Sequence, residues 1–163
     1  MSTKVFESRP QKTIAMVAHD NKKPQLLSWA ERWHNRLRTR NIYATGTTGK
    51  LLEQTLDLDV HCLQSGPFGG DQQMGALITE GQIDYLIFFW DPLTSQAHDN
   101  DVKALLRLAV LYNVPTACNI SSADFIIGSN YWDLYSPTTN NIQLPLPSAR
   151  HDNLFRPREY SDP

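Results

Sequence analysis

Short apolar runs of strand length alternate along this chain with segments whose apolar residues recur at helical spacing. The run that constrains the fold most is IDYLIFFW at 83–90, which is apolar almost throughout. A strand has this composition when helices cover both faces of its sheet, as in parallel α/β sheets. The alternation therefore predicts an α/β fold, a three-layer α/β/α open sheet that is mostly parallel and has about five strands.

The apolar runs and stripes also predict where the elements lie. The expected strands are 13–18, 41–44, 60–63, 83–90 and 114–119. Helical stripes are formed by Leu26, Leu27, Ala30, Trp33 and Leu37, by Met74, Leu77 and Ile78, and by Val102, Leu105, Leu106, Ala109 and Val110. Pro24 suits the first turn of a helix and Gly81 suits a helix end.

The length of 163 residues predicts a single domain. Residues 1–11 are expected to be a flexible N-terminus. Five of the ten prolines fall within 129–163, so we expect an irregular Pro-rich tail that wraps the domain, with a weak strand pattern at 141–146.

Composition excludes several function classes. Lys and Arg number 15 and Asp and Glu number 17, so the net charge is −2, and without a basic block neither nucleic acid nor an anionic membrane is the expected partner. There is no apolar run near the roughly 20 residues of a membrane span, and the polar N-terminus does not predict a signal peptide. Cys62 and Cys118 form no CxxC pair, which favours a cytoplasmic location.

Four polar segments each follow a predicted strand. They are HDNKK at 19–23, TGTTG at 45–49, SGPFGGD at 65–71 and WDP at 90–92. In an open α/β sheet, the loops that leave the carboxyl ends of neighbouring strands line one ligand crevice. These segments therefore predict the site.

TGTTG has the features of a phosphate cradle, because its hydroxyls and glycines precede a helix N-terminus with unpaired N–H groups. A helix cap by Thr47 or Thr48 is the structural alternative. Neither GxxxxGK[ST] nor GxGxxG is present. Ser65 and Gly66 repeat the cradle pattern, and Lys23 offers a cation for phosphate unless it is simply solvated.

Asp71 and His98 are the candidate proton-transfer groups. Asp71 opens a predicted helix, so it either caps that helix or faces the crevice as a general base. His98 precedes another helix, expected to start near Asn100 with Asp99 as its cap, and Asp101 follows three residues after His98. The helix N-terminus favours a neutral imidazole, which still donates a hydrogen bond. A solvated surface histidine is the alternative.

Metal and nucleophile chemistry are not expected. HExxH, HxxEH and paired CxxC spacings are absent, so we predict no bound metal. GxSxG is also absent, and neither cysteine lies in a polar segment.

Several longer motifs resemble the methylglyoxal synthase family. They are VAHD at 17–20 with Lys23, YATGTTG at 43–49, SGPFGGDQQMGALI at 65–78, DYLIFFWDPL at 84–93 and HDNDVKALLRL at 98–108. The resemblance runs from about residue 12 to 127. Asn100 departs from the proline of the family pattern, and the tail after Gly128, with Arg150, does not align.

The resemblance implies a homohexameric lyase of a glycolytic bypass that converts dihydroxyacetone phosphate to methylglyoxal and inorganic phosphate without a cofactor, with phosphate as product and inhibitor. It implies that Asp71 is the general base through which an enediolate forms, that His98 is an oxygen donor and proton shuttle, and that Asp101 is an acidic catalytic residue. The implied substrate and phosphate contacts are His19, Lys23, Thr45, Gly46, Thr47, Thr48, Ser65 and Gly66, supported by Asp20 and Asp91.

Two related functions are alternatives to the lyase. A regulatory domain at the end of carbamoyl phosphate synthetase binds phosphorylated effectors on a similar fold without catalysis, but it has no need of Asp71 and His98. An inosinate cyclohydrolase acts on a larger nucleotide, and the polar segments here have few aromatic residues on which a base would stack. We therefore expect the lyase.

Overall fold

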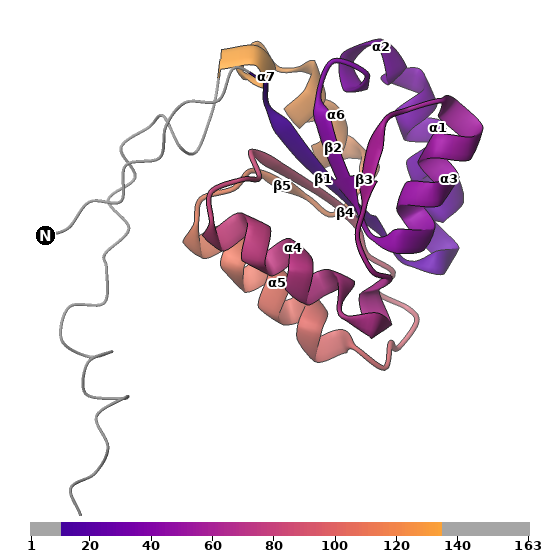
Figure 1. Cartoon of the computed structure of the whole chain (residues 1–163), viewed down its shortest axis with the longest axis vertical. Helices are drawn as coiled ribbons and strands as arrows, with labels where there is room; N and C mark the ends of the chain where they lie inside the picture. The colour runs from indigo at the N-terminus through magenta and orange to yellow at the C-terminus, as the bar shows by residue number, and fades with distance from the viewer. Residues whose placement is uncertain (1–10, 135–163) are drawn as a thin grey trace, which may run out of the picture.

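The computed structural model describes residues 11–134, which form one five-stranded sheet between two layers of helices (Figure 1). The strands are β1 (Thr13–Ala18), β2 (Asn41–Ala44), β3 (Val60–Cys62), β4 (Tyr85–Phe89) and β5 (Thr116–Ala117). They lie in the order β3-β2-β1-β4-β5 and every pair is parallel. The predicted fold class and strand number are confirmed.

The helices divide between the two faces of the sheet. They are α1 (Lys23–Arg32), α2 (His34–Leu37), α3 (Gly46–Leu56), α4 (Gly70–Thr79), α5 (Asp99–Leu111), α6 (Ile120–Gly128) and α7 (Tyr131–Leu134), with 3₁₀ turns η1 (Asp20–Lys22) and η2 (Gly66–Phe68). Figure 1 shows α4 and α5 together on one face, and α1 and α3 on the other. Within residues 11–134, no helix has the length and apolar character needed to cross a membrane.

Alternate residues of the central strands pack into two separate cores. In β1, Ile14 and Met16 face the core formed with α1, α3 and α6, whereas Ala15 and Val17 face the core formed with α4 and α5. β4 alternates in the same way, and all five of its residues are buried. The unbroken apolar run therefore follows from the period of two along a strand that is covered on both faces.

The strand order creates a switch point beside β1. The chain passes from β1 through α1 and α2 to β2 and through α3 to β3, then returns through α4 to β4 on the other side of β1. The loops after β1 and β4 consequently diverge to opposite faces, which opens a crevice at the carboxyl ends of these strands.

Several element ends differ from the sequence expectation. β5 is shorter than 114–119, because the N–H of Val114 bonds Ala109 O at the end of α5, and the Asn119 side chain accepts from Ser122 N as the cap of α6. α5 begins at Asp99, with His98 rather than Asp99 at the cap position. Gly81, with φ of 71°, follows α4 as predicted.

The first part of the predicted irregular tail is helical. Tyr131–Leu134 forms α7, which buries the Trp132 ring against Tyr85 at a centroid distance of 4.6 Å. The apolar contact explains why this turn is ordered despite its short length. The expected strand at 141–146, Arg150 and residues 1–10 lie outside the described residues.

Candidate active site

A polar cavity of about 190 Å³ lies at the carboxyl ends of β1, β2 and β3. This cavity is called the polar cavity below. It is lined by Val17, Ala18, His19, Asp20, Lys23, Thr45, Thr47, Ser65, Gly66, Pro67, Asp71, Gln96 and His98. Three of the four polar segments thus meet in one crevice, as their position after the strands predicts. No residue of the fourth segment, at 90–92, lines the cavity.

Asp71 points into the polar cavity and does not cap α4. The cap position belongs to Gly69, whose φ is 99°, and Asp71 lies in the first helical turn. Gly70 lets the helix begin here, since a Cβ at this position would be 2.0 Å from Gln64 O. The Asp71 side chain is buried, and neither oxygen has a hydrogen-bond partner among the described residues. Burial raises the pKa of Asp71.

His98 lies beside Asp71 in the polar cavity. Its Nε2 lies 3.6 Å from Asp71 Oδ2. A Cβ at position 66 would be 2.9 Å from His98 Nε2, so Gly66 leaves the room in which the imidazole reaches the carboxylate. His98 Nδ1 is buried without a partner in the described part of the chain. The pair is therefore free to exchange protons with a bound molecule.

His19 is held as a hydrogen-bond donor toward the polar cavity. Its Nδ1 accepts the backbone N–H of Asp91 at 3.1 Å, so the proton of the neutral ring sits on Nε2. Nε2 is buried and has no partner within residues 11–134. Burial lowers the pKa of His19, and the neighbouring His98 lowers it further. The ring packs edge-on against Phe88 and His98.

The other end of the polar cavity is suited to an anion. Thr45 and Thr47 line it at the N-terminus of α3, where the first backbone N–H groups lack acceptors within the helix. Lys23 also lines it, with its side chain 15% exposed, and donates to the carboxylate of Asp20, which is 95% exposed. The hydrogen bond and charge of Lys23 lower the pKa of Asp20.

Other predicted contacts are engaged elsewhere. The N–H of Gly46 donates to Gln64 O, and the buried Thr48 hydroxyl donates to Ala18 O at 3.4 Å. Neither residue lines the polar cavity. The alternative interpretation of TGTTG, a helix cap by Thr47 or Thr48, is wrong, because Thr45 occupies the cap position of α3, without a side-chain cap bond.

The two remaining predicted carboxylates also lie outside the cavity lining. Asp101, in the first turn of α5, is close enough to raise the pKa of Asp71 by repulsion. Asp91 accepts from Asn21 Nδ2 at 2.9 Å and from Leu93 N at 3.1 Å. Hydrogen bonds, first from Asn21, lower the pKa of Asp91 to about 2.

Comparison with known proteins assigns the family. A family model described as an MGS-like domain matches residues 25–118. The methylglyoxal synthase of Hahella chejuensis is 51% identical over 137 residues, which cover 84% of this chain and 90% of the relative. The chain belongs to the methylglyoxal synthase family. The methylglyoxal synthase of Cellvibrio japonicus is 58% identical over 118 residues, which cover 72% of this chain and 77% of the relative.

A solved structure of a family member has the same fold. The crystal structure of methylglyoxal synthase from Elizabethkingia anophelis superposes with a TM-score of 0.72 at 51% sequence identity. The match covers 76% of this chain and 81% of that one.

Sequence reasoning singled out neither of two polar residues in or beside the candidate site. Gln96 lines the polar cavity from the loop between β4 and α5. Asn21 bonds Asp91 from η1. Both follow the carboxyl end of a strand, and that position is the signal that could have singled them out. Among the described residues, no group of three His, Cys, Asp or Glu side chains is arranged to hold a metal ion.

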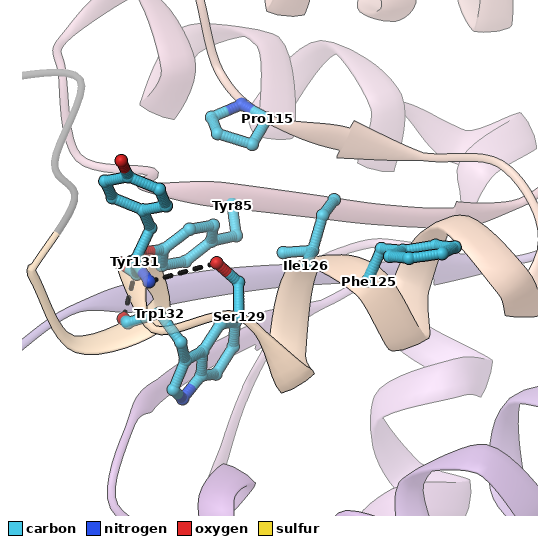
Figure 2. A pocket seen from close by; sticks show the side chains of 7 residues that line it. All are labelled: Tyr85, Pro115, Phe125, Ile126, Ser129, Tyr131 and Trp132. Atoms are coloured by element: carbon cyan, nitrogen blue, oxygen red, sulfur yellow. Dashed lines mark hydrogen bonds between the residues drawn. The ribbon is translucent and has the colours of Figure 1, made fainter.

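A second cavity, of about 460 Å³, is apolar, and we call it the apolar pocket (Figure 2). It is lined by Tyr85, Pro115, Phe125, Ile126, Ser129, Tyr131 and Trp132. Figure 2 shows Phe125 and Ile126 on α6, with Tyr131 and Trp132 pointing in opposite directions. None of these residues carries a carboxylate, an amine or an imidazole.

Proposed function

We propose that this chain is a methylglyoxal synthase, a lyase that converts dihydroxyacetone phosphate to methylglyoxal and inorganic phosphate. The observation that carries the proposal is the carboxylate of Asp71, buried beside His98 and unpartnered within residues 11–134. The carboxylate is buried in the polar cavity, has no hydrogen-bond partner among the described residues and lies 3.6 Å from His98. A raised pKa and uncommitted oxygens are what a general base requires.

In the first step, Asp71 takes a proton from the hydroxyl-bearing carbon next to the ketone. The electron pair of that C–H bond forms the carbon–carbon double bond of an enediolate, and the negative charge moves to the former ketone oxygen. His98 and the Nε2–H of His19 donate hydrogen bonds to the substrate oxygens. Donors already oriented for this charge account for roughly 10² to 10³ in rate each in other enzymes.

In the second step, the hydroxyl of the carbon that Asp71 deprotonated gives up its O–H proton and becomes the aldehyde carbonyl, the double bond shifts to the phosphate-bearing carbon, and phosphate leaves with the electrons of its C–O bond. The C–O bond that breaks must stand perpendicular to the enediolate plane, so that its electrons overlap the π system. Lys23 and the N–H groups of Thr47 and Thr48 in the first turn of α3 stabilise the departing dianion. The remaining enol takes a proton at its terminal carbon, through His98, and becomes methylglyoxal.

The proposed reaction needs no cofactor. Proton removal and phosphate elimination leave carbon at the same overall oxidation level, so no electron acceptor is required. The charge that develops is met by imidazole, ammonium and backbone donors, so the scheme requires no metal. Product phosphate fits the same donors as the substrate phosphate, which predicts inhibition by phosphate.

A homohexamer is the proposed assembly, as the family resemblance implies. Large apolar side chains stand exposed on this chain, among them Phe68, Leu93 and Phe125, with Leu93 at 94%. Exposed apolar surface of this kind favours protein contacts. The cytoplasm is the proposed location, since Cys62 and Cys118 are both free thiols.

The decisive test is incubation of the purified protein with dihydroxyacetone phosphate in metal-free buffer while both products are measured. We expect methylglyoxal and phosphate in equal amounts. Tight binding without turnover would contradict the proposal and indicate a regulatory phosphate-binding domain instead.

A further inference from the structure

We propose that Asn21 is a positioning residue, which acts through Asp91 to hold His19 as the neutral tautomer with its Nε2–H directed into the polar cavity. The inference deepens the proposed function and rests on it. The structural evidence for it is a chain of hydrogen bonds that crosses the switch point of the sheet, from Asn21 through Asp91 to His19.

Asn21 joins the two loops that diverge from the central strands. It lies in η1, directly after β1, whereas Asp91 follows β4. The Asn21 Nδ2 group donates to Asp91 Oδ2 at 2.9 Å and approaches Thr94 Oγ1 at 3.3 Å. These partners are 70 and 73 positions away in sequence. The asparagine therefore ties the loop that carries His19 to the loop that carries Asp91.

Asp91 is held from two sides by this arrangement. One carboxylate oxygen accepts from Asn21 and the other accepts from Leu93 N, and the residue is only 5% exposed. With its side chain held, its own backbone N–H is aimed at His19 Nδ1. The His19 backbone is held in turn, because its N–H donates to Phe89 O at 3.2 Å.

A backbone N–H is a donor that cannot become an acceptor. His19 Nδ1 must therefore present its lone pair, and the single proton of the neutral ring stays on Nε2. Protonation of Nδ1 would set two N–H groups against each other, so the bond also disfavours imidazolium. Of the charged groups around the ring, Asp91 and Asp99 favour the charged form, whereas His98 and Lys23 oppose it.

Asn21 has no direct place in the reaction. It is exposed and does not line the polar cavity. The buried Nε2 of His19 is the atom that benefits, because a donor without a partner is what a substrate oxygen satisfies. Loss of Asn21 should therefore act on His19 and leave the anion contacts of Lys23 in place.

The test compares Asn21→Ala with Asn35→Ala, a matched control at an exposed position of α2. In the wild-type protein, ¹⁵N NMR of His19 should report a protonated Nε2 and an unprotonated Nδ1. In Asn21→Ala we expect a mixture of tautomers and a fall in kcat of roughly 10- to 100-fold, the loss seen when a group that orients a histidine ligand is removed. The acid limb of kcat/KM should move to higher pH. The control should change none of these.

A second experiment exchanges the amide and the carboxylate between positions 21 and 91 to restore their hydrogen bond. Asn21→Asp alone sets two carboxylates together and should be at least as impaired as Asn21→Ala. Adding Asp91→Asn restores one donor and one acceptor, so the double variant should regain the Nε2–H tautomer and most of the rate.

A wild-type His19 protonated on Nδ1, or an unchanged tautomer in Asn21→Ala, overturns the role of Asn21. Absence of turnover in the wild-type protein would instead overturn the proposed function, because the tautomer is read without catalysis.

Discussion

The polar cavity and the apolar pocket differ in size and in chemistry, and the smaller one holds the candidate site. The apolar pocket has about 460 Å³ and the polar cavity about 190 Å³. A three-carbon phosphate needs little room, but it needs donors and a base. The convergence of a buried carboxylate and two imidazoles, rather than volume, thus marks the polar cavity as the candidate site.

Both regions contain a buried polar atom without a partner among the described residues, since Trp132 Nε1 also lacks one, but only in the polar cavity do these atoms belong to ionisable side chains. Beside the apolar pocket, the Tyr85 hydroxyl donates to the carbonyls of Tyr131 and Trp132, and the rings of Tyr85 and Trp132 stack. In the polar cavity, atoms of Asp71, His19 and His98 remain unpartnered within the described residues. Such groups cost folding free energy, which is typical of sites kept ready for a ligand. We therefore expect substitutions at the apolar pocket to affect stability and substitutions in the polar cavity to affect activity.

The largest expected effect is on catalysis in the polar cavity. Asp71→Asn removes the proposed base and should lower kcat by at least roughly 10² to 10⁴, the usual contribution of acid–base catalysis, while phosphate still binds. Steady-state kinetics and phosphate titration measure both. Asp59→Asn, at an exposed site before β3, is the control. Near-normal turnover in Asp71→Asn would make Asp71 a structural residue.

The next effect is on stability at the apolar pocket. Trp132→Ala deletes a buried ring and should lower the free energy of unfolding by about 3–5 kcal/mol, with unchanged kcat for the folded protein. Tyr131→Ala removes an exposed neighbour and should change stability far less. Urea denaturation together with activity assays measures the pair. A lower kcat at normal stability would bring the apolar pocket into the catalytic machinery.

A smaller effect is expected at the anion end of the polar cavity. Lys23→Ala should weaken binding of inorganic phosphate by roughly 10- to 100-fold, because a hydrogen bond to a charged group contributes about 1.5–3 kcal/mol. Calorimetric titration with phosphate measures the loss. Lys50→Ala, exposed on α3 and outside the cavity lining, should bind normally. Equal affinities of both variants would refute the anion role of Lys23.

The smallest effect is the stability cost of the base itself. Because burial raises the pKa of Asp71 above its ordinary 3.8, the ionised carboxylate destabilises the folded state as pH rises through the raised value. Asp71→Asn should therefore raise stability at pH 7 by about 0.5–2 kcal/mol. The gain should disappear below the ordinary pKa, where Asp71 is protonated in both states. A pH series of thermal unfolding curves measures it, and a less stable variant at pH 7 would contradict it.

Periodicity predicted the framework well because the core depends on local pattern. The bounds of β1 and β2 match the expectation, and β4 lies within its predicted run. The first helical stripe fails in one respect, since α1 ends at Arg32 and α2 begins at His34 although the apolar spacing continues to Leu37. An apolar stripe needs only a common face, so it does not reveal a break in the backbone.

The loops of the candidate site were predicted, but the residues that line the polar cavity differ from the predicted contacts at Gly46 and Thr48. Thr48 and Gly46 belong to the TGTTG motif, yet their donors bond Ala18 and Gln64. Gln96 lines the polar cavity although it belongs to none of the quoted polar segments. Which donor faces a ligand depends on the rotation of a helix start, and residue type alone does not determine that rotation.

The sequence by itself determined the parallel α/β sheet, the polar loops at its carboxyl ends and the family. Only the tertiary structure decided which polar groups remain free. Asp71 is not the cap residue of α4, because Gly69 occupies that position with φ of 99°. The His19 tautomer depends on the backbone N–H of Asp91, which is 72 positions away in sequence. Local periodicity sets which residues are buried, but a hydrogen bond joins atoms that the fold brings together.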